Sequence, residues 1–395
     1  MNLSVPTNWQ PDLLDGINKS KVVEIYGKLD KDPIGGGRPS SILPHIDKRQ
    51  VKDYILKVHQ YGLKFNYLLN AVCLGNIEWT AAGQKQIRGF LDWLSAIGVD
   101  TVTVSLPYLL ELVKKQYPHF ETKVSVCAQV ADPLQAKYWQ DLGADTITLS
   151  PWALNRDFKS LREIRRTVKC KLQLYANTRC LSGCPFVQYH YSSHSHSSRT
   201  NDKSFFINYF RFSCDYLILK QPWRLIAASW IRPEDLKHYE EVGINSAKLS
   251  DRSMKTEHIQ RIVEAYTMEK YDGNLMDLFI NPEKRLETGR GRAIKKSKFL
   301  FYLFKINLFD IHRLLDQVPN SDPTFLDNGK LDGFLKFFIE GKCSRTNCAE
   351  CGYCRDIANK ALSMPDDYRS KLIYLYEDLL KSIIDGTMFT QNNYK

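Results

Sequence analysis

The stretch Leu94-Ser-Ala-Ile-Gly98-Val-Asp100-Thr-Val-Thr-Val-Ser105 combines the end of an amphipathic helix, a glycine, a short polar turn and a β-branched strand. The same order recurs in Trp139-Gln-Asp-Leu-Gly143-Ala-Asp145-Thr-Ile-Thr-Leu-Ser150 and in Tyr239-Glu-Glu-Val-Gly243-Ile-Asn245-Ser-Ala-Lys-Leu-Ser250. Glycine suits the left-handed backbone position that ends many helices, where a β-carbon would be unfavourable. The strand that follows is short and apolar, as expected in a parallel sheet that is buried on both faces.

Strand and helix candidates alternate on both sides of these repeats. Further strands are predicted at Lys21–Gly27, Lys64–Val72, Lys123–Val130 and Lys171–Ala176, and helices at Lys48–Tyr61, Ala81–Ile97, Pro107–Tyr117, Pro133–Leu142 and Lys159–Val168. Sustained alternation predicts an α/β fold with a parallel sheet, and the repeated turn favours a closed (β/α)8 TIM-like barrel. No helix opens directly behind Gly35-Gly36-Gly37, so a dinucleotide-binding fold is the weaker alternative.

Length and composition fit one large domain with an extension, since the chain has 395 residues of which 43% are hydrophobic. We expect the barrel at residues 1–270 and a helical, cysteine-rich extension at 271–395. The extension is predicted to begin with a turn capped by Asn274 and a basic connector at 284–298. Helices are predicted at 300–318, at Gly333–Glu340 and after Tyr368, and we expect the extension to fold against the barrel.

Charge and targeting signals bear on partners and location. The net charge of +11 permits contact with RNA, but much of the surplus lies in the basic connector, so RNA binding is a minority interpretation. The first residues lack the basic stretch and apolar run of a secretory signal, and no segment is apolar enough to span a membrane. We therefore expect a cytoplasmic protein whose cysteines serve metal binding rather than disulfides.

A first cysteine group, formed by Cys180, Cys184 and Cys214, begins where the Lys171 strand ends. That is the carboxyl end of a barrel strand, the face where barrel enzymes hold their active sites. The residues between them are predicted to be a polar loop around 189–198, and Cys214 to open a strand-like run, Asp215–Lys220. Thiolates suit zinc or an iron–sulfur cluster, and His190, His194 and His196 are candidate additional ligands. A radical S-adenosylmethionine motif is absent, because position 187 is valine.

A second group, Cys343, Cys348, Cys351 and Cys354, reads C-x4-C-x2-C-x2-C. Four cysteines so close together can wrap one iron–sulfur cluster, which we favour, while zinc remains the alternative. The three other cysteines stand alone and are interpreted as small apolar residues.

Several segments together resemble the collagenase-like peptidase family U32 over about residues 20–270. They are Asn177-Thr-Arg-Cys180-Leu-Ser-Gly-Cys184-Pro-Phe, Cys214, the hairpin-like Leu217–Trp230, Ile231-Arg-Pro233-Glu-Asp235-Leu236 and Gly243-Ile-Asn-Ser-Ala-Lys248-Leu-Ser-Asp-Arg252. The resemblance implies a barrel that carries a 4Fe-4S cluster on Cys180, Cys184 and Cys214. It also implies oxygen-independent hydroxylation of ubiquinone precursors or RNA bases, with the peptidase label resting on older assignments.

This chain departs from the family pattern at Lys237, where many members have a further cysteine. One iron then lacks an obvious ligand, and three explanations stay open: a histidine of the 190–196 segment, a cysteine of the second group, or an iron left open for substrate. The second group would hold a second, electron-relay cluster. The implied partners are a second subunit of the same family or an electron donor.

The expected activity is that of an iron–sulfur oxidoreductase or hydroxylase acting on a small molecule or an RNA base. A peptidase and a zinc-stabilised RNA- or partner-binding module are the alternatives. No G-x-S-x-G or H-E-x-x-H motif supports hydrolysis, and no catalytic residue is identified. Polar residues expected near strand ends, and hence near a pocket, are Glu24, Asn70, Gln129, Asn177, Lys248 and Arg252.

Overall fold

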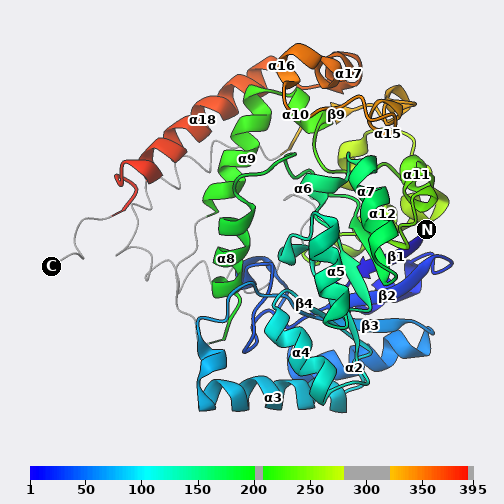
Figure 1. Cartoon of the computed structure of the whole chain (residues 1–395). Coiled ribbons are helices and arrows are strands. Elements are labelled where there is room, and N and C mark those ends of the chain that lie inside the picture. The colour runs from blue at the N-terminus through cyan, green and yellow to red at the C-terminus, as the bar shows by residue number, and fades with distance from the viewer. Residues whose placement is uncertain (201–207, 280–320, 390–395) are drawn as a thin grey trace.

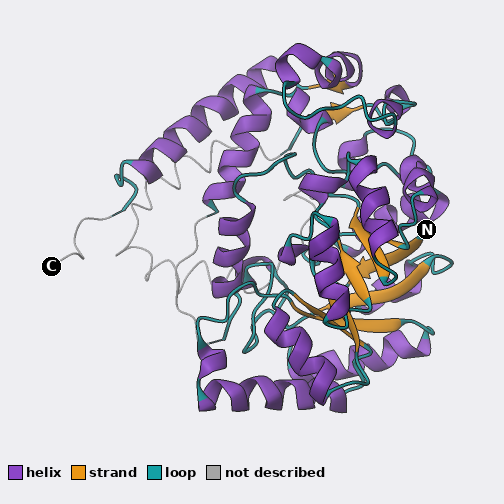
Figure 2. Ribbon diagram, in the orientation of Figure 1, coloured by secondary structure: helices purple, strands orange, loops and turns teal. Residues whose placement is uncertain are grey.

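Eight parallel strands close into a barrel in the computed structural model, which describes residues 1–200, 208–279 and 321–389. The strands follow one another in chain order, and β8 pairs with β1 to close the ring. Their bounds are β1 Asn2–Pro6, β2 Val22–Gly27, β3 Lys64–Leu69, β4 Thr101–Val104, β5 Glu121–Val124, β6 Thr146–Thr148, β7 Lys171–Tyr175 and β8 Ser246–Lys248. Figure 2 shows these strands gathered inside a layer of helices. The chain is a (β/α)8 TIM-like barrel, as the repeats predicted.

Helices cover the barrel and continue into a separate tier (Figure 1). Around the barrel lie α1 Pro11–Gly16, α2 Lys48–Gln60, α3 Ala81–Ala96, α4 Pro107–Gln116, α5 Pro133–Asp141, α6 Pro151–Leu154, α7 Phe158–Thr167, α11 Leu236–Glu241 and α12 Thr256–Met268. Between β7 and β8 come α8 Val187–Ser197, α9 Tyr209–Lys220 and α10 Trp223–Ile226. The C-terminal tier contains α15 Lys336–Ile339, α16 Cys348–Cys351, α17 Tyr353–Ala361 and α18 Asp366–Ile384, with a small antiparallel sheet of β9 Phe325–Leu326 and β10 Leu362–Ser363.

The glycines of the three sequence repeats have the expected conformation, with φ of +82°, +101° and +85° at Gly98, Gly143 and Gly243. The polar residue two positions after each glycine also forms a hydrogen bond to the neighbouring strand. Asp100 Oδ2 accepts a hydrogen bond from the Phe65 amide at 2.7 Å, at the start of the preceding strand. Asp145 does the same for Thr122 at 2.7 Å, and Asn245 for Leu172 at 2.8 Å. Each repeat therefore ends a helix and also ties its strand to the neighbouring one.

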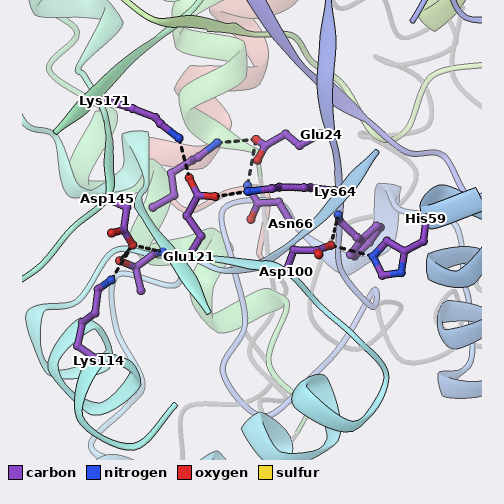
Figure 3. A network of polar contacts seen from close by, with 12 residues as sticks. Glu24, His59, Lys64, Asn66, Asp100, Lys114, Glu121, Asp145 and Lys171 are labelled. Carbon is purple, nitrogen blue, oxygen red and sulfur yellow. Dashed lines mark hydrogen bonds and ion pairs between the residues drawn. The ribbon is translucent and has the colours of Figure 1, made fainter. Parts of the chain in front are cut away.

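The rim of the barrel where the strands begin, its amino-terminal end, is held together by ion pairs (Figure 3). Glu121 receives Lys64 at 2.8 Å and Lys171 at 3.3 Å, so one carboxylate joins β3, β5 and β7. Lys114 pairs with Asp145 at 2.6 Å. This end of the barrel is thus a stabilising rim, whereas chemistry in such folds belongs to the opposite end.

The barrel interior is polar rather than aliphatic. Lys123 Nζ lies 2.5 Å from Glu24 Oε1, and each of the two side chains is 6% exposed. The same carboxylate oxygen accepts bonds from the Ser4 hydroxyl and from Asn66 Nδ2, the latter at 3.2 Å. Thr103 in turn donates to Asn66 Oδ1 at 2.8 Å. These hydrogen bonds give the buried polar atoms partners, which offsets the desolvation cost of placing an ion pair in the interior.

Two strand predictions differ from the structure. The first strand, β1, runs from Asn2 to Pro6, where no strand was predicted, and the strand at Lys171 is the seventh of the barrel. The strand predicted at Lys123–Val130 is β5, which ends at Val124 and is followed by a 3-10 turn at Val126–Ala128. Gln129 therefore follows a turn, where it adopts a left-handed φ of +57°, rather than ending a strand.

The polar loop predicted around 189–198 is wrong, because these residues form the helix α8. Its hydroxyl groups bond back to the carbonyls of the preceding turn, as Ser195 does to Tyr191 at 2.8 Å and Ser198 to His194 at 2.8 Å. A serine whose hydroxyl bonds to a carbonyl of its own helix can be buried without leaving that hydroxyl unpaired. The polar sequence therefore concealed a helix that packs against the barrel mouth.

The strand-like run after Cys214 is also wrong, since Cys214 lies inside the helix α9. The apolar residues at its C-terminal end pack against α18, where Leu219 forms a buried cluster with Leu372, Leu375 and Leu379. The hairpin-like Leu217–Trp230 segment is the end of α9 followed by α10. Its β-branched and aromatic content misled the prediction, and the contact with a distant helix decided its structure.

The described part of the extension is helical, and Figure 1 shows α18 running alongside α9. Asn274 caps a 3-10 turn at Leu275–Leu278 by accepting a bond from the Met276 amide at 3.1 Å. The predicted connector at 284–298 and helix at 300–318 lie outside the described residues. Within the described ranges, none of the helices combines the length and apolar character needed to cross a bilayer.

Candidate active site at the mouth of the barrel

A hollow of about 410 Å³, counting its open mouth, lies at the carboxyl ends of the strands. It is lined by Tyr26, Gly37, Arg38, Leu68, Asn70, Val126, Cys127, Tyr175, Tyr191, Lys248, Asp251 and Arg252. Three cations and one carboxylate are among these residues, so the hollow is electropositive.

The glycine run Gly35-Gly36-Gly37 brings Arg38 into this hollow. The Gly36 amide donates to Ser198 Oγ at 2.8 Å, and the Gly37 amide to Asn70 Oδ1 at 3.2 Å. A β-carbon at Gly36 would lie 2.8 Å from Asn70 Oδ1, and one at Gly37 would lie 2.9 Å from Cys127 Sγ. Only glycine permits so close an approach of the backbone to these side chains. The run is therefore a packing device that places an arginine.

The cations of the hollow differ in how they are held. Arg38 Nε lies 3.3 Å from Asp251 Oδ2. Arg252 is buried, and its Nη1 has no hydrogen-bond partner within the described residues. Lys248 Nζ lies 4.0 Å from the centre of the Tyr26 ring. Burial, reinforced by the charge of Lys123, lowers the pKa of Lys248 to about 7.

The first cysteine group gathers beside this hollow. The Cys184 and Cys214 side chains hydrogen-bond to each other, the charge of Cys184 acts on Cys180, and that of Cys180 acts on Cys214. The bond from Cys214 lowers the pKa of Cys184 to about 7, while Cys184 and burial raise that of Cys214. Burial raises the pKa of Cys180, which also interacts electrostatically with Arg38. Three thiols from β7–α8 and from α9 thus meet at the edge of the hollow.

In the described parts of the chain, no set of three or more His, Cys, Asp or Glu side chains stands ready to enclose a single metal ion. A lone zinc ion requires sulfurs about 2.3 Å from one centre. A cluster is larger, and its cysteines are ligands to different irons. The soft donor chemistry, the proximity of the thiols and the lowered pKa of Cys184 fit such a cluster, which Cys180, Cys184 and Cys214 would hold.

The histidines of α8 are held by other contacts. His194 Nδ1 lies 3.1 Å from the Gly37 carbonyl oxygen, and His190 stacks on Phe210 with ring centres 4.6 Å apart. Burial lowers the pKa of His190 to about 3 and that of His194 well below its usual value. Both rings are therefore neutral at physiological pH. His196 is on the same helix, and Lys237 is exposed on α11.

The second cysteine group lies in the C-terminal tier. Cys348 and Cys351 begin and end α16, Cys354 is on α17, and Cys343 precedes both helices. Burial raises the pKa of Cys354 to about 12, and the charges of the other three cysteines contribute. The four thiols are thus within electrostatic reach of one another, as a shared metal centre would require. All ten cysteines of the chain are free thiols.

The segment that carries these cysteines is fastened to the barrel. Arg345 Nη2 lies 2.5 Å from Asp157 Oδ2, and Arg345 Nη1 donates to the Ala153 carbonyl oxygen. Arg156 stacks over Trp230 at 4.6 Å and over Phe334 at 5.1 Å. The anchor is on the loop and helix after β6, next to the strand that leads into the first cysteine group.

Five of the six polar residues expected near a pocket separate into two sets, and the sixth, Gln129, is not among the residues that line the hollow. Asn70, Lys248 and Arg252 line the hollow. Glu24 lies within the barrel, bonded to Lys123, and Asn177 holds the backbone of Ser250 and Leu278 at 2.7 and 3.0 Å. Sequence reasoning missed Arg38, Asp251 and the three tyrosines. A signal existed for Arg38, because it follows a glycine run, but only the close packing of that run reveals its purpose.

Comparison with known proteins identifies the family. A family model described as Peptidase family U32 matches residues 44–287. This chain belongs to peptidase family U32. It is 31% identical over 331 residues to an uncharacterized protease of Methanocaldococcus jannaschii, covering 84% of this chain and 86% of that protein. The solved U32 peptidase Mk0906 is 22% identical, with a TM-score of 0.49, and the match covers 64% of this chain and 93% of that one.

Membership in the U32 family was expected from the cysteine and Pro-Glu-Asp-Leu segments, and that prediction is confirmed. The family match begins at residue 44, shortly before α2, and ends at residue 287, so it includes the first cysteine group but not the second. The C-terminal cysteine segment is therefore outside the matched region.

Proposed function

We propose that this U32 protein is an iron–sulfur enzyme that carries out oxygen-independent redox or hydroxylation-type chemistry on a small molecule or a single RNA base. The observation that carries the proposal is the meeting of Cys180, Cys184 and Cys214 at the edge of an electropositive hollow. Bound there, an iron–sulfur cluster would supply electron transfer, or a Lewis-acid iron where a protein ligand is lacking. The neighbouring cations would bind and orient the substrate.

The position and charge of the hollow support a small anionic ligand, such as a metabolite or one base turned out of a nucleic-acid strand. Arg38, Lys248 and Arg252 outnumber the single carboxylate Asp251, so an anionic group on the ligand is favoured. Desolvated cations of this kind bind carboxylates or phosphates more strongly than exposed ones.

A peptidase is the second candidate, supported by the protease description of the relative from Methanocaldococcus jannaschii. Hydrolysis by a cysteine requires a thiolate with a basic partner. Cys127 lines the hollow, but burial raises its pKa. No histidine is among the described residues that line the hollow. The iron–sulfur proposal therefore accounts for more of the site.

For the C-terminal cysteines we propose a second iron–sulfur centre that relays electrons, with structural zinc as the alternative. A redox enzyme of this kind needs an electron donor or a second subunit of the same family. Ten free thiols are in keeping with the reducing conditions of the cytoplasm, which we propose as its location.

The test is anaerobic purification followed by iron, sulfide and zinc analysis. About eight irons per chain are expected for two four-iron clusters, and about four irons with one zinc if only the first group holds a cluster. Cys184→Ser should remove the first cluster, while Cys170→Ser, at a half-buried cysteine outside both groups, should leave the iron content unchanged. Iron-free wild-type protein after anaerobic reconstitution, or peptide cleavage that survives iron removal, would contradict the proposal.

A further inference from the structure

Lys248 stands apart from the other lysines of the barrel because its amine faces the hollow without an acidic partner. It ends β8, lines the hollow, and has its Nζ 4.0 Å from the centre of the Tyr26 ring. Within the described residues no carboxylate hydrogen-bonds to this amine. The nearby Glu24 carboxylate is already engaged, since Lys123 Nζ lies 2.5 Å from it.

The groups around Lys248 favour the uncharged amine. Burial is the main influence, and the charges of Lys123 on β5 and Arg252 after β8 oppose protonation in the same sense. Glu24 on β2 and Cys127 before α5 act in the opposite direction. The balance brings the pKa to about 7, so about half of the molecules carry a neutral, nucleophilic amine at neutral pH. Desolvation of this kind activates lysines that form Schiff bases.

Arg252 supplies an anion site in the same hollow. Its side chain is buried, and its Nη1 lacks a hydrogen-bond partner among the described residues. Arg38, by contrast, is neutralised by Asp251 at 3.3 Å. A buried guanidinium with a free N–H is matched by a carboxylate, which accepts such bonds with charge assistance.

We propose that Lys248 forms an imine with the carbonyl carbon of small 2-oxo acids whose carboxylate is held by Arg252. The amine nitrogen adds to the carbonyl carbon to give a carbinolamine. The former carbonyl oxygen then leaves as water while a C=N bond forms. Over the two steps, both protons of the amine are transferred to this water. No oxidant or reductant is consumed. Tyr175 lines the same hollow, and burial raises its pKa, so its hydroxyl stays protonated and donates a hydrogen bond to the departing oxygen.

This inference does not depend on the iron–sulfur centre. The experiment treats the anaerobically purified full chain with pyruvate and sodium cyanoborohydride, maps the reduced adducts by peptide mass spectrometry, and measures iron in the same samples. Lys248 should be modified at least about ten-fold faster than Lys171, an exposed lysine outside the hollow that pairs with Glu121. Lys248→Arg should remove the adduct at this site and keep the charge.

Arg252→Met separates the two parts of the proposal. It removes a charge that opposes protonation of Lys248, so trapping of acetone, which lacks the carboxylate, should slow modestly. Trapping of pyruvate should slow at least about ten-fold more than trapping of acetone. If folded wild-type protein is modified at Lys171 but carries no adduct at Lys248, the imine proposal is overturned. Equal losses for pyruvate and acetone in the Arg252 variant overturn the carboxylate site. Adduct formation in iron-free protein would leave this inference standing while contradicting the iron–sulfur proposal.

Discussion

Replacing Lys123 by methionine should destabilise the barrel in a way that depends on pH. Lys123 Nζ and Glu24 Oε1 lie 2.5 Å apart inside the barrel, and both side chains are 6% exposed. Methionine fills a similar volume but removes the cation. The Glu24 carboxylate then remains in the interior with only the Ser4 hydroxyl and the Asn66 amide as donors.

The size of the effect follows from the burial of the pair. Removing one partner of a buried ion pair typically costs about 3–5 kcal/mol, because the other charge is left without compensation. The double variant Glu24→Gln, Lys123→Met has no unpaired charge and should recover most of that loss. Lys114→Met is the matched control, because its pair with Asp145 is partly exposed and should cost at most about 1 kcal/mol.

The pH dependence has a defined sign. Burial alone would raise the pKa of Glu24, but the charge and hydrogen bond of Lys123 outweigh it, so the pKa in the folded protein lies below its ordinary value. In the wild type this contribution is present at neutral pH and is lost as the pH falls through the lowered pKa. Without Lys123, burial raises the pKa, and the carboxyl can be protonated at little cost in mild acid. The difference between wild type and Lys123→Met should therefore shrink as the pH is lowered from 7.5 to 5.

Urea unfolding followed by circular dichroism measures these free energies. The reasoning is refuted if the single variant is no less stable than the double variant at pH 7.5. It is equally refuted if the loss caused by Lys123→Met is the same at both pH values.

Three further tests probe local features of the fold, the first two by the same unfolding assay and the third by hydrogen exchange. In α3, Gly83→Ala should destabilise the protein, because the added methyl group would overlap a backbone carbonyl of the turn before the helix. Gly89→Ala, where the space is open, should stabilise it by about 0.5–1 kcal/mol. The reverse order of stability would contradict the packing described. Asp47→Ala removes the side-chain cap of α2 and should cost about 1 kcal/mol, and an unchanged midpoint would show that the capping box contributes nothing. Arg345→Ala breaks the ion pair with Asp157 and should speed hydrogen exchange of residues 343–354 while leaving the barrel strands protected, so uniform exchange would argue against a separate anchor.

Local sequence patterns were sufficient for the barrel. The repeat built on Gly98, Gly143 and Gly243 predicted helix ends followed by strands, because left-handed glycine and short β-branched runs are properties of a few adjacent residues. The structure adds that Asp100, like its counterparts in the other repeats, binds the amide at the start of the preceding strand. A first strand at the N-terminus was missed because Asn2–Pro6 is not preceded by the helix end and glycine turn that mark the strands of the repeats.

Helices α8 and α9 show where such patterns fail. The serines and histidines of α8 looked like a surface loop, and the run after Cys214 in α9 looked like a strand. Hydrogen bonds back to Tyr191 and packing of Leu219 against α18 settled both as helices. Propensity is a weak guide where distant contacts are strong.

For the site, the sequence alone determined the family and the residue types that can hold a soft metal, since cysteine spacing is a local property. The metal assignments themselves remain predictions. Only the tertiary structure brought Arg38, Arg252 and Lys248 into one hollow, and only it revealed that Lys123 engages Glu24 across 99 positions of chain. Charge pairing, burial and the resulting pKa values depend on which residues come into contact when the barrel closes. Spacing along the sequence does not show which residues these are.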